Sequence, residues 1–300
     1  MKLFLRNSLL FALSFVAVER FCHKQTHGFR PYKIYSDHTQ SPRWEFKSLS
    51  KEKTQEVQML LKQPFTFLAS GGESYVFVSQ DQKTVLKVFK HHHMREHTWY
   101  DDLPCPTFLS PLRSYVRHAR KKRRNQFFTS CKIAYENFRE GTGLIYLQLN
   151  PRAEWKGEIE LYDAIGAFHK FDPNTLPFAL QKLATPAYTT LSELMEAGET
   201  GAAMTRLASL LGLMNRRYEL GIADHDPRKR NFGFIKDKAI ELDLGSFSLD
   251  PTLQSPTRRR KAFLVETLKL RRWINKYHPT LTDFLEEKIK ENIEFEAEIV

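Results

Sequence analysis

Residues 219–247 read ELGIADHDPRKRNFGFIKDKAIELDLGSF, and this stretch decides the fold. Asp226 lies five positions before Asn231, and Asp243 lies twelve positions after Asn231. The apolar-rich segment between Asn231 and Asp243, with a polar tip at residues 236–238, is typical of a β-hairpin. A hairpin brings its two ends side by side, so we expect Asn231 and Asp243 to meet at one edge of a sheet, with Asp226 close by. Amide and carboxylate oxygens are suitable ligands for a hard cation that holds the phosphates of a nucleotide.

This stretch resembles two motifs of the protein-kinase-like fold. DHDPRKRN is similar to the catalytic loop H-R-D-x-x-x-x-N, and the DLG at residues 243–245 is similar to the metal-binding turn D-F-G. The resemblance implies that Asp226 orients the acceptor hydroxyl and takes its proton. It also implies that Asn231 and Asp243 hold magnesium, and that Arg228 or Lys229 neutralises charge on the transferring phosphoryl group.

The catalytic-loop motif departs from the kinase pattern at two positions. Asp224 stands where the histidine of H-R-D is expected, and His225 stands at the arginine position. Taken alone, the stretch also fits a surface hairpin with a few acidic turn residues. The rest of the chain has to decide between these interpretations.

Length and composition allow either one large domain or two lobes that share a cleft, because the chain has 300 residues and 41% of them are apolar. The net charge of +11 favours anionic partners such as a nucleotide, an acidic lipid, nucleic acid or an acidic protein. Three cysteines, Cys22, Cys105 and Cys131, provide no metal-ligand spacing and no disulfide framework.

The N-terminal segment, residues 1–22, resembles a signal sequence or a membrane-associating segment. Lys2 and Arg6 precede an apolar run of ten residues from Leu9 to Val18, which is shorter than the ~20 residues of a membrane-spanning helix. An export signal, an uncleaved surface anchor and an ordinary packed helix all remain open. Residues 23–62 read as a linker or an irregular N-terminal extension that ends in a short helix capped by Ser50.

A second informative stretch, residues 65–90, reads FTFLASGGESYVFVSQDQKTVLKVFK and predicts three strands. Gly71 and Gly72 fit a tight turn whose backbone N–H groups approach a phosphate. Lys87 lies in an apolar strand and resembles the kinase lysine that contacts the α- and β-phosphates. The full G-x-G-x-x-G pattern is not kept, since Tyr75 stands at a position where a small residue is expected.

Residues 113–140 predict a helix that corresponds by its order in the chain to the kinase αC helix. The resemblance implies that a glutamate of this helix pairs with Lys87; Glu136 is the first candidate, with Glu140 and Glu96 behind it. A basic run at residues 117–124 fits either a solvated helix face or an anionic surface contact. It lacks the interleaved aromatic residues of a nucleic-acid stacking platform, so nucleic acid is not a favoured partner.

The remaining elements predict an α+β fold with two lobes. Strands at 143–149, 159–171 and 177–183 complete an antiparallel sheet of about five strands in an N-lobe at residues 63–184. Residues 183–191 fit a hinge. A shortened, mainly helical C-lobe at residues 185–300 contains helices at 192–198, 200–220, 262–277 and 281–295 and carries the catalytic loop and the DLG turn.

The C-lobe lacks an A-P-E-like segment, and only 55 residues follow Gly245. These are the parts that build the peptide platform of ordinary protein kinases. The chain therefore resembles compact, atypical members: RIO-type kinases, Kdo kinases of the lipopolysaccharide core and small-molecule phosphotransferases. Residues 127–149 and 224–245 together also resemble kinase-like proteins of chlamydiae.

The sequence thus predicts a phosphotransferase that depends on ATP and Mg²⁺ and acts on a hydroxyl of a lipid, a sugar or a small molecule rather than a peptide. The alternative is a pseudokinase or nucleotide-binding module with a basic surface for a membrane or another partner. Localisation stays open between the cytoplasm, a membrane surface and export.

Overall fold

The structure is a computed structural model that describes residues 2–98, 101–104 and 106–294, so Cys105 and the end of the last predicted helix lie outside the described residues. The chain forms two compact units. Unit 1 combines residues 1–124 with 148–180, and unit 2 combines residues 125–147 with 181–300. The predicted lobes differ from these units chiefly at residues 125–147, which cluster with unit 2. The division into lobes at residue 184 stays a prediction.

The fold is a mixed α+β fold with a mainly antiparallel main sheet of strand order β4-β7-β3-β2-β1-β5-β6. The boundary between the units runs through β4 and β7. The seven strands are β1 (Phe65–Ser70), β2 (Ser74–Ser79), β3 (Thr84–Phe89), β4 (Leu144–Gln148), β5 (Ile159–Tyr162), β6 (Phe168–Phe171) and β7 (Phe178–Lys182).

Strand pairing in unit 1 corrects the prediction of a purely antiparallel sheet of about five strands. The hairpin pairs β1–β2, β2–β3 and β5–β6 are antiparallel, but β1 and β5 are parallel. The parallel pair arises because β5 follows β1 only after a long connection, whereas consecutive strands joined by short turns run antiparallel.

Residues 29–61, most of the predicted linker or N-terminal extension, pack against unit 1. The N-terminal region as a whole contains α1 (Lys2–Gln25), η1 (Pro31–Lys33), η2 (Pro42–Trp44) and α2 (Lys51–Leu61). Phe29, Ile34 and Trp44 are buried. Ser50 caps α2 as predicted, because its side chain accepts a hydrogen bond from Lys53 N.

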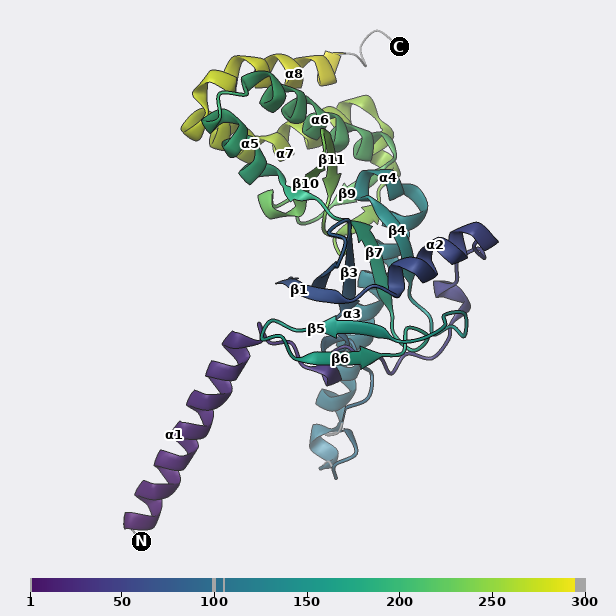
Figure 1. Ribbon diagram of the computed structural model, residues 1–300, viewed down its shortest axis with the longest axis vertical. Helices are drawn as coiled ribbons and strands as arrows, with labels where there is room; N and C mark the ends of the chain where they lie inside the picture. Colours follow the sequence, from purple (N-terminus) through teal and green to yellow (C-terminus); the bar gives the residue numbers. More distant parts are fainter. Residues whose placement is uncertain (1, 99–100, 105, 295–300) are drawn as a thin grey trace. The chain divides into compact units, whose positions relative to one another are not determined.

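The first helix, α1, stands away from the other elements of unit 1 (Figure 1). Most of its apolar side chains are exposed, Phe11 and Phe15 among them. Within the described residues, no helix combines the length and the apolar character needed to cross a bilayer.

Unit 2 is mainly helical. Its helices are the second half of α3 (Ser110–Asn137), α4 (Arg139–Thr142), α5 (Ala187–Glu196), α6 (Thr200–Glu219), α7 (Pro256–Tyr277) and α8 (Thr282–Glu294). Two small sheets accompany them, with strand orders β11-β10-β8 and β12-β9. Their strands are β8 (Thr185–Pro186), β9 (Ile222–Asp224), β10 (Phe232–Ile235), β11 (Lys238–Glu241) and β12 (Phe247–Leu249). Further 3₁₀ turns among the described residues are η3 (His91–His93), η5 (Thr107–Leu109), η6 (Lys229–Asn231), η7 (Pro251–Gln254) and η8 (Pro279–Leu281).

Helix boundaries in unit 2 depart from the sequence prediction at two places. The predicted hinge at residues 183–191 contains β8 and the start of α5, so that helix begins before Ser192. Helix α7 starts at Pro256 rather than at residue 262, so it also includes the basic residues 258–261. Proline is well placed in the first turn of a helix, where its missing N–H has no partner to lose.

Candidate active site

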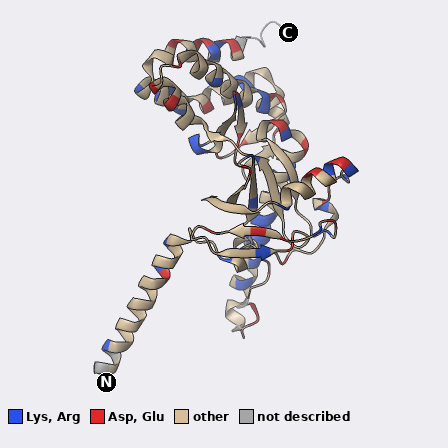
Figure 2. Cartoon of the chain, viewed as in Figure 1, with Lys and Arg blue, Asp and Glu red and all other residues tan. Residues whose placement is uncertain are grey.

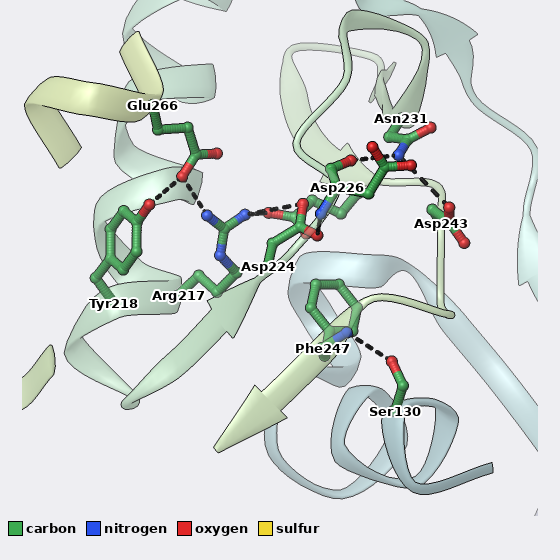
Figure 3. A network of polar contacts seen from close by, with 10 residues as sticks. Ser130, Arg217, Tyr218, Asp224, Asp226, Asn231, Asp243, Phe247 and Glu266 are labelled. Atoms are coloured by element: carbon green, nitrogen blue, oxygen red, sulfur yellow. Dashed lines mark hydrogen bonds and ion pairs between the residues drawn. The ribbon is translucent and has the colours of Figure 1, made fainter. Parts of the chain in front are cut away.

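The hairpin β10–β11 brings the two predicted metal ligands together in unit 2. Its register pairs Phe232 with Glu241 and Ile235 with Lys238. Beyond the paired residues, Leu242 N donates to Asn231 O at 2.6 Å. Asn231 Nδ2 then lies 3.5 Å from Asp243 Oδ2 (Figure 3). The meeting of these two side chains, predicted from the hairpin spacing, is confirmed.

Asp226 is tied to the same asparagine. Asn231 is buried, and its Nδ2 donates a hydrogen bond to the backbone carbonyl of Asp226 at 2.8 Å. Because Nδ2 serves both the Asp226 carbonyl and the Asp243 carboxylate, the orientation of the amide is fixed. The three polar positions of the loop therefore form one cluster.

The Asp226 carboxylate is engaged by its near neighbour Arg228, whose Nε lies 2.5 Å from Asp226 Oδ1. Both side chains reach solvent, with 55% of Arg228 and 35% of Asp226 exposed. Lys229 is also exposed, in η6. An exposed ion pair of this kind contributes at most about 1 kcal/mol, so Arg228 can leave the carboxylate at small cost.

The DLG turn is anchored to α3 by Ser130 (Figure 3). Ser130 Oγ donates to Leu244 O at 2.6 Å and accepts from Phe247 N at 2.6 Å. A Cβ at Gly245 would lie 3.1 Å from the Phe127 ring, so a side chain there would force that ring to shift by a few tenths of an ångström. The Asp243 carboxylate accepts a hydrogen bond from Gly245 N at 3.0 Å, which orients it within the turn.

Behind the loop lies a buried charge cluster that the sequence reasoning missed. Arg217 of α6 has no exposed side-chain surface and contacts Glu241 of β11 and Glu266 of α7. Glu266 also accepts a hydrogen bond from the Tyr218 hydroxyl. A signal for this cluster was present, because Arg217 follows Leu210 and Met214 at helical spacing on the apolar face of α6.

Asp224, which replaces the expected histidine, joins this buried cluster to the loop. Its Oδ2 lies 3.8 Å from Arg217 Nη1, and its Oδ1 accepts a hydrogen bond from Asp226 N at 2.9 Å. The side chain of Asp224 is only 3% exposed. The departure from H-R-D therefore places a carboxylate where it holds the loop backbone against a buried arginine.

Burial raises the pKa of Glu241 to about 8, against the opposing effect of Arg217, and the neighbouring carboxylates Asp224 and Glu266 add to the rise. Burial acts to lower the pKa of Arg217, but Glu241 and Glu266 outweigh it, so the arginine pKa is raised and the guanidinium stays charged. One arginine thus faces three carboxylates, and a proton on Glu241 relieves the excess negative charge.

The donor set at the loop fits Mg²⁺. Within the described part of the chain no group of three or more His, Cys, Asp or Glu side chains could hold a metal by itself. Asn231 and Asp243 provide one amide and one carboxylate. Mg²⁺ characteristically takes one or two such protein ligands and completes its shell with water and phosphate oxygens.

The predicted glycine turn lies in unit 1, between β1 and β2. Gly71 N donates to Ser74 O at 2.9 Å, and Lys90 Nζ donates to Gly71 O at 2.5 Å and to Ser70 Oγ at 2.9 Å. Tyr75, the residue that breaks the glycine pattern, is buried and donates from its hydroxyl to Gly28 O at 2.6 Å. Its ring therefore fills the core beneath the N-terminal region.

Lys87 is buried on β3, opposite Val76 of β2. Its three candidate partners make other contacts. Glu136 is exposed and lies 3.7 Å from Lys132 one turn away on α3. Glu140 lies 3.5 Å from Lys238, and Glu96 contacts Arg124 and Lys121. The pairing of Lys87 with Glu136 stays a prediction.

The basic run of α3 is largely neutralised by acidic neighbours within unit 1, although Figure 2 shows many Lys and Arg residues along this helix. Arg117 and Arg120 lie 3.8 Å and 3.7 Å from Asp101, and Arg123 lies 2.6 Å from Glu73. These pairs favour a solvated helix face with internal ion pairing.

Comparison with known proteins gives a distant structural likeness. No family model matches the chain, and no curated protein matches it. Among solved structures, the chain is similar to WbdD, described as a bifunctional kinase-methyltransferase, with TM-scores of 0.33, 0.30 and 0.31 for three structures, one of them a complex with the kinase inhibitor LY294002. Sequence identity is 14–17%; the match covers 73–75% of this chain and 43–46% of the WbdD chains, so it spans less than half of their length. At these TM-scores and identities the likeness carries no argument about function, so the function has to be inferred from the chain's own residues.

Proposed function

We propose that the protein is a phosphotransferase that moves the γ-phosphoryl group of ATP to a hydroxyl acceptor. The observation that carries the proposal is the cluster in unit 2, where Asn231 Nδ2 lies 2.8 Å from the Asp226 carbonyl and 3.5 Å from the Asp243 carboxylate. A loop carboxylate beside an amide–carboxylate pair is the set that phosphoryl transfer uses, because this chemistry depends mainly on positioning and electrostatics.

In the proposed reaction Asp226 orients the acceptor hydroxyl and accepts its proton as the new O–P bond forms. The bond between the γ-phosphorus and the bridging oxygen breaks, and ADP leaves with that electron pair. Asn231 and Asp243 would hold Mg²⁺, which when bound supplies positive charge against the phosphate oxygens. Arg228 would exchange its contact with Asp226 for the transferring phosphoryl group, and Lys229 would assist.

The chemistry of two elements of unit 1, Lys87 and the glycine turn, suits contacts with the remaining phosphates of the nucleotide. Lys87 would contact the α- and β-phosphates, and the backbone N–H groups at Gly71 and Gly72 would approach the phosphate chain. Lys90 holds the carbonyl of Gly71 at 2.5 Å, which stabilises this turn.

A nucleotide-binding module without catalysis is the second candidate, and one observation favours it. Arg228 Nε lies 2.5 Å from Asp226 Oδ1, so the carboxylate of the proposed base is already engaged. A binding module needs Asn231 and Asp243 for Mg²⁺ but has no use for a free Asp226.

The test compares Asp226→Ala and Asp243→Ala with the native chain, using radiolabelled γ-phosphate transfer from ATP to fractionated lipids, metabolites and proteins. Loss of the base should slow transfer by about 10²–10⁴-fold while the thermal stabilisation by Mg-ATP persists. Asp243→Ala should lose the part of that stabilisation that depends on Mg²⁺.

Asp237→Ala is the matched control, because Asp237 is an aspartate of the same hairpin with 66% of its side chain exposed. It should leave transfer and stabilisation unchanged. Transfer that survives in Asp226→Ala would refute the assignment of the base. Stabilisation by ATP without any transfer by the native chain would establish the binding module instead.

A further inference from the structure

Helix α1 carries a large exposed apolar surface. It stands away from the other elements of unit 1 (Figure 1). The large apolar side chains of α1 that are more than half exposed are Phe4, Leu9, Leu10, Phe11, Leu13, Phe15, Val16, Val18 and Phe21. Contiguous apolar surface of this kind marks a site of interaction with another molecule or with a membrane.

These apolar side chains surround the middle of the helix rather than lining one face. Successive residues of an α-helix are rotated by about 100°, so Leu10, Phe11 and Val16 lie about 100–140° apart around the axis. A second helix packed against α1 covers one side only, whereas the acyl chains of a lipid layer cover every side. The distribution therefore favours lipid over a second copy of this chain or a partner helix.

The cationic side chains of α1 lie near its two ends and share one side. Arg6, Arg20 and Lys24 are exposed, and their spacing places them within about 40° of one another around the axis. Phe11 and Phe15 lie on the opposite side of the helix. A basic side and an aromatic side on one helix are typical of helices that lie in the interface of a membrane.

The charge of α1 is complementary to an anionic lipid surface. Glu19 is the one acidic residue within residues 2–25, and Arg30 neutralises it, with Nη2 3.1 Å from Glu19 Oε1. The helix thus keeps an excess of cations, and the whole chain has a net charge of +11. Anionic phospholipids attract basic segments of this kind at the level of the headgroups.

The length of the apolar run indicates how α1 would lie on a bilayer. The ten helical residues from Leu9 to Val18 rise by about 15 Å, which is about half of the ~30 Å hydrocarbon layer. Lying along the surface places both cationic ends of the helix at the headgroups at once. The chain directly after α1 is fixed to the sheet of unit 1, because the His27 ring stacks on Phe67 of β1 with ring centroids 5.2 Å apart. Phe29 likewise lies edge-on to His169 of β6, at 5.4 Å.

We propose that α1 is a membrane-surface helix that binds bilayers containing anionic phospholipid. Phe11 and Phe15 enter the boundary between headgroups and acyl chains, and the phosphates of the lipids meet Arg6, Arg20 and Lys24. Because the chain after α1 is fixed to the sheet, this contact holds unit 1 at the bilayer. The contact does not depend on the proposed phosphotransferase function, so failure of either leaves the other standing.

The test is flotation of the full chain with vesicles of phosphatidylcholine, either alone or with phosphatidylglycerol added. The native chain should bind the anionic vesicles about ten-fold or more tightly than the neutral vesicles. Phe11→Glu/Phe15→Glu should weaken binding to anionic vesicles by about a hundred-fold, because both side chains lose their burial among acyl chains. Arg6→Glu/Lys24→Glu should remove most of the preference for anionic vesicles, because it replaces two attractive charges by repulsive ones.

Two control variants make matched changes on α2, another helix of unit 1. Met59→Glu alters an apolar side chain that is 64% exposed. Lys51→Glu/Lys62→Glu reverses two exposed lysines at the ends of α2, and it changes the net charge by as much as Arg6→Glu/Lys24→Glu does. Both controls should bind anionic vesicles as the native chain does.

The proposal is overturned by any of three results: no vesicle binding by the native chain, equal binding to the two vesicle types, or binding that survives Phe11→Glu/Phe15→Glu. Sedimentation velocity without lipid tests another occupant of the same surface. Self-association that disappears in Phe11→Glu/Phe15→Glu, without vesicle binding, would assign the surface to a second copy of this chain.

The intact mass of the chain recovered from the membranes of its own cells separates a resident helix from an export signal. The recovered chain should retain residues 2–25. A chain cleaved within or directly after α1 would identify an export signal and overturn the membrane-surface helix.

Discussion

The loop region of unit 2 and the glycine turn of unit 1 are held in different ways. In unit 2, Arg217 has 0% side-chain exposure and joins α6, β11 and α7, and through Asp224 it reaches the backbone of the loop. In unit 1, the turn at Gly71 is held by nearby Ser74 and by the partly buried Lys90. The loop therefore depends on buried charges from distant parts of the sequence, whereas the turn depends on neighbouring strands.

Arg217→Met should give the largest loss of stability. The change leaves Glu241 and Glu266 buried without their cationic partner, and removing one member of a buried charge cluster costs about 3–5 kcal/mol. The free energy of unfolding from urea titration, followed by circular dichroism, measures this loss. Because Asp224 loses the same partner, nucleotide-dependent stabilisation should also fall in the folded fraction.

Arg216→Met is the control for the same helix. Arg216 precedes Arg217 but is 64% exposed and pairs only with Glu219, 2.8 Å away, among the described residues. Its loss should change stability by less than about 1 kcal/mol. Equal effects of the two substitutions would show that the buried cluster does not hold unit 2 together.

The pH dependence of stability should reveal the proton on Glu241. Its pKa rises from 4.5 to about 8 on folding, so the folded state binds more protons than the unfolded state between these values. The contribution to stability is therefore complete below about pH 4.5 and is lost as the pH rises through about 8, with a slope of at most about 1.4 kcal/mol per pH unit.

Glu241→Gln isolates this contribution from the other titrating groups. The amide keeps a hydrogen-bonding oxygen for Arg217, but it neither gains nor loses a proton in this pH range. The difference in unfolding free energy, native minus Glu241→Gln, should decrease as the pH is raised from 5 to 8. Parallel curves for the two proteins would contradict the raised pKa.

The sequence carried enough information for the hairpin but not for the buried cluster. Alternating apolar residues and a polar tip define β10–β11 locally, so the meeting of Asn231 and Asp243 followed from spacing alone. The buried cluster around Arg217 could not be predicted in this way, because a single charged residue on an apolar helix face does not indicate which residues it pairs with. Glu241 and Glu266 lie 24 and 49 residues further along, where only the fold brings them close.

Local rules also misplaced two helix starts. The segment 187–191 was expected to be a hinge, but it forms the first half of α5, because its alanine and leucine pack into the core of unit 2. Likewise α7 extends back to Pro256, since a cationic run is compatible with an exposed helical turn. At α5 tertiary packing, rather than local propensity, set the boundary.

The smallest expected effect contrasts one glycine from each unit. Gly221, at the end of α6, has a φ of +66°, and a Cβ there would lie 3.3 Å from Asp250 O. Gly221→Ala should therefore destabilise by about 1–2 kcal/mol. A Cβ at Gly72 meets nothing within 4 Å, so Gly72→Ala should change stability by less than about 0.5 kcal/mol.

Thermal unfolding of the two alanine variants, with and without Mg-ATP, sharpens the comparison. If the turn in unit 1 approaches phosphate, the added methyl group of Gly72→Ala should reduce stabilisation by Mg-ATP while leaving the nucleotide-free protein unchanged. Gly221→Ala should lower the unfolding temperature in both conditions by the same amount. A Gly72→Ala variant that responds to Mg-ATP as the native chain does would remove the glycine turn from the proposed nucleotide site and leave unit 2 as its main support.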